Sequence, residues 1–241
     1  MTMTIGKIHS IETMGLVDGP GIRVVVFLQG CSLRCKYCHN PDTWEYGCGE
    51  EYTPSQLVNK IKRYKPYFKT SNGGVTFSGG EPLRQPEFLI EVLKLCKKEE
   101  IHTCIDTSGF GVGMYDEILK YTDLVLFDIK DLTREGYKNV TLMNIDESLK
   151  FLEAVQNSGT KMWIRHVVVP GLTDGEEHIR ELKKFIKTLK NVEKVELLPY
   201  HLLGVNKYEN MGLSYPLEGT PQMNKEVINI NTDTDILWIL I

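Results

Sequence analysis

The sequence lacks a long hydrophobic run and a recognisable export signal. Its longest apolar run, residues 236–241, is far shorter than the roughly 20 residues that a membrane-spanning helix needs. Residues 1–5 contain neither the basic stretch nor the apolar stretch of a signal peptide. We therefore expect a cytoplasmic protein that has no membrane partner.

A strong charge of either sign is also absent. The 28 Lys and Arg residues nearly balance the 32 Asp and Glu residues, which leaves a net charge of −4. Many lysines, such as Lys97, Lys98, Lys183 and Lys184, fall on the expected solvent faces of helices. This distribution gives no reason to expect a nucleic-acid partner.

No linker rich in Pro, Gly or Ser and no internal repeat interrupts the 241 residues, of which 41% are hydrophobic. That length and composition suit one large domain with a full core. We expect a single domain over residues 1–241, with a core at about 16–200 and a C-terminal extension over 201–241.

Cysteine is scarce outside one short segment. Three of the six cysteines, Cys31, Cys35 and Cys38, fall within residues 29–41. In a reducing compartment such a group indicates a metal site before a disulfide. A Cys-x3-Cys-x2-Cys run supplies three ligands to an iron–sulfur cluster, whereas a closed cubane normally has four. One iron is then left open for a small molecule, as catalytic zinc sites also keep one position open.

The alternative is a structural zinc site made of the three cysteines and His39. It is disfavoured because His39 directly follows Cys38 and can hardly share a tetrahedron with it. No distant Cys/His pair completes the usual spacing either. Of the other cysteines, Cys96 and Cys104 are expected as small buried hydrophobic residues, and Cys48 lies in a Gly-flanked loop without an evident role.

Buried strands alternate with amphipathic helices along the chain. Residues 5–17 suggest a short N-terminal hairpin ahead of this series. The alternation implies right-handed crossovers and a parallel sheet. We expect an α/β fold, a partial (β/α)6 TIM-like barrel, with a doubly wound open sheet as the alternative. The expected strands are 24–28, 75–77, 102–106, 124–128, 161–169 and 194–198. One helix is expected to start at 53–54, and four others are expected at 86–98, 115–121, 146–157 and 176–189.

Polar residues follow the expected strands, where the chemistry of such barrels gathers. The first strand ends in the cysteine segment, and the second ends in Ser78-Gly79-Gly80-Glu81-Pro82. The next strands end in Asp106-Thr107-Ser108-Gly109, then in Asp128-Ile129-Lys130, and the last in Pro199-Tyr200-His201, while Arg165 lies on the fifth strand. We expect these groups to meet at one rim.

Residues 29–41, the tetrad Tyr37-Cys38-His39-Asn40 and the run Asp18-Gly-Pro-Gly-Ile-Arg23 resemble the radical S-adenosylmethionine enzymes, in particular the activases of glycyl-radical enzymes. The resemblance covers roughly residues 5–228. It implies a partial barrel with a [4Fe–4S] cluster on the three cysteines and S-adenosylmethionine on the open iron. Such an oxidoreductase cleaves S-adenosylmethionine to a 5′-deoxyadenosyl radical, which takes a hydrogen atom from a glycine of its protein substrate.

The resemblance also implies roles for individual residues. It assigns a monovalent cation to Asp106 and Asp128, and the glycyl-loop peptide of the substrate to Asp18 and Arg165. Plain structural roles stay open: a tight turn at Gly79-Gly80, helix caps at the two aspartates, and an ion pair between Asp18 and Arg165. The same resemblance implies that the residues in contact with the cofactor are Tyr37, Cys38, His39, Gly79, Gly80, Glu81, Asp128, Ile129, Lys130 and His201.

Only Cys48 lies between Cys38 and Gly79, so the inserted ferredoxin-like domain of many other activases is absent. The resemblance is thus to the short type that acts on pyruvate formate-lyase. It implies that enzyme as protein substrate and a flavodoxin or ferredoxin as electron donor, and we expect a monomer. Residues 229–241 depart from the family, which has a C-terminal helix there, and have strand-like or irregular character.

Two other functions stay open from the sequence. The first is a radical S-adenosylmethionine enzyme that acts on a small molecule such as a nucleobase precursor, since the cysteine motif would be the same. The second is a non-catalytic zinc-binding protein. The run from Asp18 to Arg23 argues against the first, and the position of His39 argues against the second.

Overall fold

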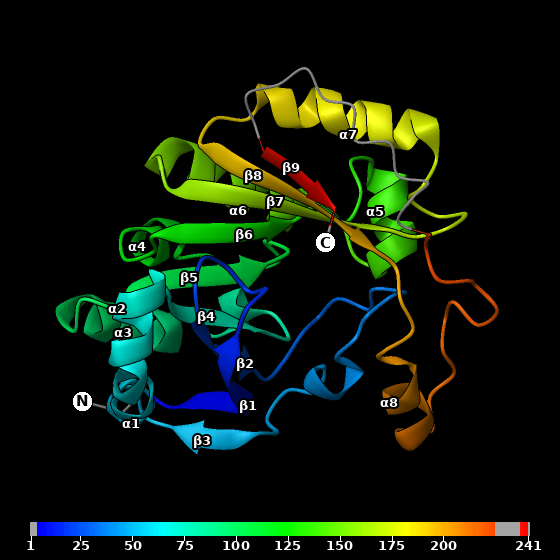
Figure 1. Cartoon of the computed structure of the whole chain (residues 1–241). Coiled ribbons are helices and arrows are strands. Elements are labelled where there is room, and N and C mark those ends of the chain that lie inside the picture. The colour runs from blue at the N-terminus through cyan, green and yellow to red at the C-terminus, as the bar shows by residue number, and fades with distance from the viewer. Residues whose placement is uncertain (1–3, 225–236, 241) are drawn as a thin grey trace.

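One mixed sheet organises the protein, of which the computed structural model describes residues 4–224 and 237–240. The nine strands of the sheet follow the order β3-β1-β2-β4-β5-β6-β7-β8-β9. Figure 1 shows them fanning into an open arc. Their bounds are β1 Gly6–Gly15, β2 Arg23–Leu28, β3 Glu50–Tyr52, β4 Gly74–Gly79, β5 His102–Thr107, β6 Leu124–Asp128, β7 Lys161–Val168, β8 Val192–Pro199 and β9 Leu237–Leu240.

The six expected strands are β2 and β4 to β8, and each pairs in parallel with the next. The predicted partial (β/α)6 barrel is therefore confirmed, and its sheet does not close. The expected N-terminal hairpin is made by β1 with β2 rather than within residues 5–17, and β3 extends it on the outer edge. At the other edge β9 pairs in parallel with β8, so part of the tail is strand; residues 229–236 and 241 lie outside the described residues.

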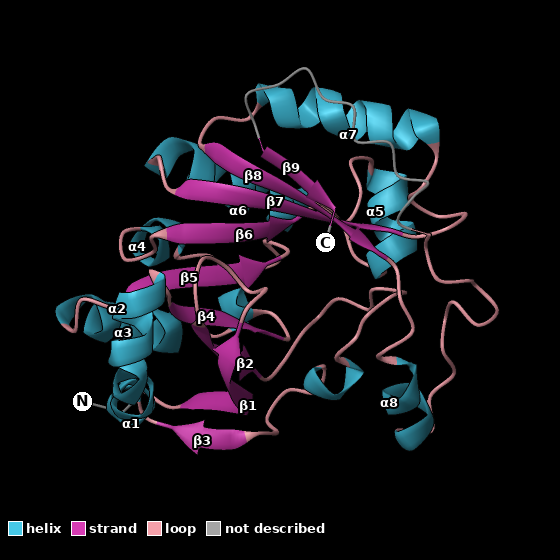
Figure 2. Ribbon diagram, viewed as in Figure 1, coloured by secondary structure: helices cyan, strands magenta, loops and turns pink. Residues whose placement is uncertain are grey.

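Helices cover the outer side of the arc (Figure 2). The described part of the chain contains three α-helices that the sequence did not predict, α2, α5 and α8, because each is short and buries few apolar side chains. Among the described residues no helix is long and apolar enough to cross a membrane. The helices are α1 Pro54–Ile61, α2 Lys65–Ser71, α3 Pro86–Lys98, α4 Tyr115–Leu119, α5 Arg134–Thr141, α6 Asp146–Ser158, α7 Glu176–Thr188 and α8 Val205–Asn210.

The start of α1 shows how local sequence sets an element. The Thr53 hydroxyl accepts a hydrogen bond from the backbone N–H of Gln56, whose side chain accepts one from the backbone of Thr53. Pro54 follows at the first helical position, where its missing N–H has no cost. Such a cap stabilises a helix by about 1 kcal/mol.

A single large core lies between the strands and the outer helices. Side chains from all six parallel strands meet the apolar faces of α1, α3, α6 and α7 there. Cys96 and Cys104 are fully buried, as expected. The strand residues in this core include Val26, Phe77, Ile105, Val125, Ile164 and Val195.

The turn between β1 and β2 gives a first prediction. Gly21 has a φ of +68°, and an added Cβ would lie 2.3 Å from the carbonyl oxygen of Ser71. Gly47 has a φ of +84° but no atom within 4 Å of such a Cβ. We expect Gly47→Ala to lower the free energy of unfolding by about 1 kcal/mol from backbone strain alone, and Gly21→Ala to lower it clearly more.

Urea unfolding of the metal-free protein, followed by circular dichroism, measures both changes. Equal losses in the two variants would mean that the contact with Ser71 adds nothing to the strain of a positive φ.

Candidate functional site

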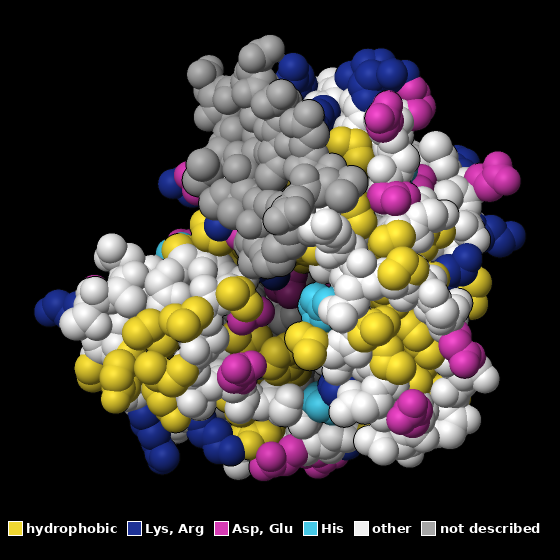
Figure 3. Space-filling view, turned by 45° about the vertical axis from the view of Figure 1, so that its right-hand side comes forward, with side chains coloured by type: hydrophobic (Ala, Val, Ile, Leu, Met, Phe, Trp, Pro, Cys, Tyr) yellow, Lys and Arg dark blue, Asp and Glu magenta, His cyan; other side chains and the backbone are white. Residues whose placement is uncertain are grey.

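A cavity of about 400 Å³ opens at the C-terminal ends of the parallel strands. Strands β4 to β8 contribute residues to its wall, and the cysteine segment that follows β2 contributes the rest of that side. In the space-filling view a hollow with acidic side chains lies near the middle of the molecule, and histidine side chains border it (Figure 3). The predicted site residues that line it are Cys31, Cys35, Tyr37, Cys38, His39, Gly79, Gly80, Glu81, Asp106, Asp128, Lys130, Arg165 and His201. The strand-end prediction is thus met for most of the site.

Two predicted site residues do not line this cavity. The side chain of Ile129 packs in the hydrophobic core instead. Its backbone is still used, because its N–H donates to the carbonyl of Arg165 over 2.9 Å and its carbonyl accepts from Nδ1 of His166 over 2.7 Å. Asp18 lies on the turn between β1 and β2, and its neighbour Val17 forms the cavity wall.

The cysteine segment is held by backbone contacts from distant parts of the chain. The N–H groups of Arg34 and Lys36 donate to the carbonyls of Thr141 and Val140, over 2.9 and 3.0 Å. Both acceptors belong to the last turn of α5. The Arg34 guanidinium also donates to the Cys31 carbonyl over 2.8 Å. The helix that sequence reasoning missed therefore shapes the segment that carries the three cysteines.

The three thiols are free and poorly solvated. Cys31 and Cys35 are buried and Cys38 is half-buried. Burial raises the pKa of the Cys35 thiol to about 12, although Lys130 opposes this, and burial and then Glu81 raise the pKa of Cys31. The thiols are therefore protonated at neutral pH in the metal-free protein, and a bound metal must displace those protons.

The donor set fits an iron–sulfur cluster better than one ion. Within residues 4–224 and 237–240, no three His, Cys, Asp or Glu side chains form a group that could hold a single metal ion. The three thiols nevertheless line one cavity. Two oxygens near them, the Tyr37 hydroxyl and Oδ1 of Asp128, are buried with no hydrogen-bond partner in the described structure. Buried polar atoms are normally bonded, so this wall suits a polar ligand.

Lys130 is the cation of this wall. It forms an ion pair with Asp128, and its Nζ lies 5.3 Å from the centre of the Tyr37 ring. Burial disfavours the charged ammonium, but Asp128, Tyr37 and Cys35 together outweigh this, and the pKa of Lys130 is raised well above its usual value. Lys130 therefore stays charged inside the cavity, while the second oxygen of Asp128 remains available.

The Gly79-Gly80-Glu81 turn fits tightly against the start of the cysteine segment. An added Cβ on Gly79 would lie 2.4 Å from the Leu28 nitrogen, and one on Gly80 would lie 2.5 Å from the Gly30 carbonyl. Glycine is needed here for backbone packing as well as for access to the cavity. The position of the cysteine segment therefore depends on this turn.

Glu81 stabilises this turn through its buried side chain. Its carboxylate is 1% exposed and accepts hydrogen bonds from the Thr107 hydroxyl and from the N–H and hydroxyl of Ser108. Burial raises its pKa, and these hydrogen bonds oppose the shift. The bonds join the end of β4 to the end of β5, as the predicted supporting role of Glu81 requires.

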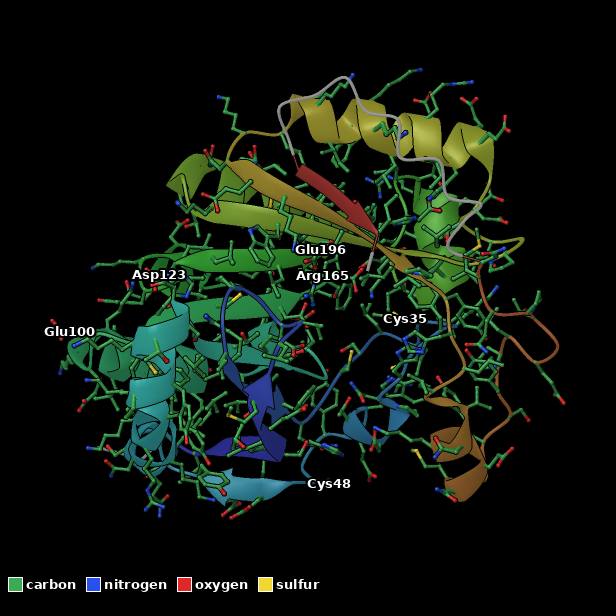
Figure 4. The ribbon with its side chains drawn as sticks, in the orientation of Figure 1. Cys35, Cys48, Glu100, Asp123, Arg165 and Glu196 are labelled. Atoms are coloured by element: carbon green, nitrogen blue, oxygen red, sulfur yellow. The ribbon has the colours of Figure 1, made fainter. Side chains whose placement is uncertain are left out.

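Arg165 occupies the centre of a buried ion-pair network. Its Nε donates to Oε2 of Glu196 over 2.7 Å, and its Nη1 lies 3.6 Å from Oδ1 of Asp106. Its Nη2 donates to the carbonyl of Val17. Figure 4 shows Arg165 and Glu196 side by side on neighbouring strands, and Lys194 lies 2.6 Å from the other oxygen of Glu196.

The ion pair left open between Asp18 and Arg165 is not formed, because Arg165 pairs with Glu196 and Asp106. Burial and then the nearby Asp106 raise the pKa of Asp18 to about 6. Sequence reasoning missed Glu196. The one signal in the sequence is an acidic residue in a strand that is otherwise apolar at this end, Val195-Glu196-Leu197-Leu198.

Two histidines close the cavity beside Cys38. The rings of His39 and His201 lie 4.2 Å apart, and Nε2 of His39 is 3.2 Å from the His201 carbonyl. Burial and then His201 lower the pKa of His39 to about 4, so its ring is neutral at physiological pH. Cys48 is exposed and lies well away from Cys35 (Figure 4), so it takes no part in this site.

Known proteins are similar to this chain in sequence. Residues 25–186 match the radical SAM superfamily. A pyruvate formate-lyase-activating enzyme from Clostridium pasteurianum is 62% identical over 224 residues, which are 93% of this chain and 94% of that protein. The chain belongs to the pyruvate formate-lyase-activating enzymes of the radical SAM superfamily. The pyruvate formate-lyase 1-activating enzyme of Escherichia coli K12 is 46% identical and covers 93% of this chain and 92% of its own length.

Solved structures agree on the fold of this family. A domain of a pyruvate-formate lyase-activating enzyme from Bacteroides vulgatus is 28% identical, with a TM-score of 0.57 over 70% of this chain and 98% of that one. Streptococcus suis SuiB bound to S-adenosylmethionine is 16% identical, with a TM-score of 0.58 over 88% of this chain and 48% of that one. Membership of the radical SAM family implies a [4Fe–4S] cluster and S-adenosylmethionine as cofactors.

The raised pKa of Asp18 predicts a pH-dependent gain of stability in Asp18→Asn. The folded protein binds the Asp18 proton more tightly than the unfolded chain does, because the pKa is about 6 against a usual 3.8. The charged Asp18 carboxylate therefore lowers the free energy of unfolding of the wild type. This loss is absent below about pH 4 and grows as the pH rises through about 6. We expect the variant to unfold at a higher temperature than wild type at about pH 8, with the difference shrinking toward pH 4.

Thermal unfolding of the metal-free proteins across this pH range measures the effect. Asp116→Asn, which changes an exposed aspartate, is the control. A difference for Asp18→Asn that does not change with pH would contradict the buried-carboxylate explanation.

Proposed function

We propose that this chain activates pyruvate formate-lyase by forming a radical on a glycine of that enzyme. The observation that carries the proposal is one cavity that combines three free cysteine thiols, a charged Lys130 and two unpartnered buried oxygens, in a chain 62% identical to an activating enzyme. The small-molecule enzyme and the zinc-binding protein are not favoured, because the curated relatives over nearly the whole chain are activating enzymes.

Cys31, Cys35 and Cys38 would hold the [4Fe–4S] cluster in our proposal. When bound and reduced, the cluster supplies one electron that cleaves S-adenosylmethionine, and the carbon radical so formed takes a hydrogen atom from the glycine. The protein keeps the site poorly solvated: Cys31 and Cys35 are buried, and Trp44 and Leu33 complete the wall beside them. Exclusion of water protects a reactive intermediate from side reactions.

The residues around Lys130 would bind S-adenosylmethionine. The free Oδ1 of Asp128 and the Tyr37 hydroxyl can each bond to its polar groups, and the rings of His39 and His201 offer flat faces to the adenosine. Gly79 and Gly80 let the ligand approach the backbone, and Glu81 keeps their turn in place. Ile129 contributes through its backbone, since its side chain is in the core.

A monovalent cation would bind between Asp106 and Asp128. Both carboxylates line the cavity, and Asp128 has one oxygen without a partner. Each carboxylate already has one protein cation, Arg165 or Lys130. A singly charged ion suits this partly neutralised pair.

Asp18 and Arg165 would face the glycyl loop of the substrate. Arg165 lines the cavity and bonds to the carbonyl of Val17, the neighbour of Asp18 that forms part of the cavity wall. In this proposal the single domain over residues 1–241 works in the cytoplasm as a monomer, which leaves the mouth open to a protein loop. A flavodoxin or ferredoxin would supply the electron.

The direct test is anaerobic reconstitution with iron and sulfide. We expect about four irons per chain and no zinc. After reduction, S-adenosylmethionine and pyruvate formate-lyase should give 5′-deoxyadenosine together with the glycyl-radical EPR signal. Deoxyadenosine without the signal would reject this substrate, and neither product from an intact cluster would reject the activity.

Arg165→Gln separates substrate binding from cofactor chemistry. We expect glycyl-radical formation to fall about 30-fold, because a buried charged hydrogen-bond donor is worth about 2 kcal/mol. Cleavage of S-adenosylmethionine without protein substrate should change less than about threefold. Lys161→Gln removes an exposed ion pair from the far end of the same strand and should leave both unchanged. Equal loss of both activities in Arg165→Gln would place Arg165 in the cofactor site instead.

A further inference from the structure

Arg23 is a completely buried arginine to which the proposed function gives no task. It opens β2 on the interior side of the barrel and is 0% exposed. Within the residues that the structure describes, no carboxylate forms an ion pair with it, unlike Arg165. Burial lowers its pKa. A buried cation without a carboxylate partner is costly, so its retention calls for an explanation.

The N–H groups of the Arg23 guanidinium donate hydrogen bonds both to the sheet and to the turn between β1 and β2. Nη2 donates to the carbonyl of Val75 on β4, and Nη1 lies 3.2 Å from Nδ1 of His102 on β5. Arginine only donates, so the histidine nitrogen accepts. Nη1 also reaches the carbonyl of Pro20 at 3.4 Å. The guanidinium thereby ties β4 and β5 to the turn that carries Asp18.

Thr76 extends this connection to Asp18 itself. Its hydroxyl accepts from Nε of Arg23 over 2.9 Å and donates to the backbone carbonyl of Asp18 over 2.6 Å. The Thr76 hydroxyl thus uses a lone pair for Arg23 and its hydrogen for Asp18, and it links the two residues. The short turn has two glycines at positive φ, Gly19 at +124° and Gly21 at +68°. Its ends are held from elsewhere, by Arg165 at the Val17 carbonyl and by Ser71 at the Ile22 N–H. Arg23 and Thr76 therefore hold its middle.

We propose that Arg23 and Thr76 are positioning residues, which hold the Asp18 turn from inside the barrel so that the Asp18 carboxylate faces the substrate glycyl loop. The inference rests on the proposed function for the substrate role of Asp18. It explains why the run from Asp18 to Arg23 is a unit: the last residue of the run folds under the turn and fixes the first. The geometry puts no atom of Arg23 in the cavity, so it acts only through the turn.

The test uses Thr76→Val, which keeps the shape of the side chain and removes both hydrogen bonds. The matched control is Thr103→Val on β5. Thr103 is equally buried, and its hydroxyl donates to the carbonyl of Tyr121 over 2.8 Å, away from the Asp18 turn. Thr76→Ser should restore the hydroxyl.

With reconstituted enzyme we expect Thr76→Val to raise the KM for a glycyl-loop peptide about tenfold, the factor that one hydrogen bond supplies. Cleavage of S-adenosylmethionine without peptide should stay within about twofold of wild type. Thr103→Val should leave both unchanged, and Thr76→Ser should recover most of the affinity. Equal effects of the two valine variants on KM would overturn the proposal.

Hydrogen exchange provides an arm that does not depend on activity. Thr76→Val should speed the exchange of backbone amides in residues 16–22, and Thr103→Val should not. If wild type itself forms no glycyl radical, the proposed function fails while faster exchange still supports the role of Arg23 and Thr76 in holding the turn. Unchanged exchange in Thr76→Val overturns that role even when the activation assay succeeds.

Discussion

Charge buried inside an open barrel is the constraint on which the site depends. The parallel strands bring their polar ends to one rim, where the cysteine segment and Val17 of the turn after β1 complete the wall of the cavity. A buried charge is costly unless it is paired or hydrogen-bonded. Lys130 with Asp128 and Arg165 with Glu196 meet this condition as ion pairs, whereas Glu81 and Arg23 meet it through hydrogen bonds. The positions of the catalytically interesting groups follow from this pairing as much as from the strands.

The atoms that remain unpaired are as informative as the pairs. Oδ1 of Asp128 and the Tyr37 hydroxyl have no partner in the described structure, and Asp18 has a pKa raised by burial. Two further buried atoms without a partner, Nε of Arg84 and the Tyr137 hydroxyl, belong to residues that do not line the cavity. Buried polar atoms are normally bonded, so the two that line the cavity mark where a ligand can complete the bonding. These atoms lower the stability of the free protein, and a ligand that bonds to them restores it.

Much of this arrangement could be read from the sequence, for a simple reason. Apolar runs such as Val24 to Leu28 mark strands buried on both faces, and a parallel sheet puts the residues after them at one edge. Glu196 was missed because an acidic residue in a strand is normally expected to face solvent. Here it is 1% exposed and forms an ion pair with Arg165. Helices α5 and α8 were missed because their few apolar residues give a weak helical pattern.

The cysteine segment shows what such patterns leave out. Its spacing identifies the chemistry, but its shape comes from contacts more than a hundred residues away in the chain. The carbonyls of Val140 and Thr141 accept from one side of the segment, and the Tyr208 hydroxyl donates to the Cys38 carbonyl from the other over 3.1 Å. Those three partners lie in or at α5 and α8, which are two of the helices that the sequence did not predict. Because their stability comes from packing rather than from local propensity, the elements that hold the thiols are the ones that local patterns predict least well.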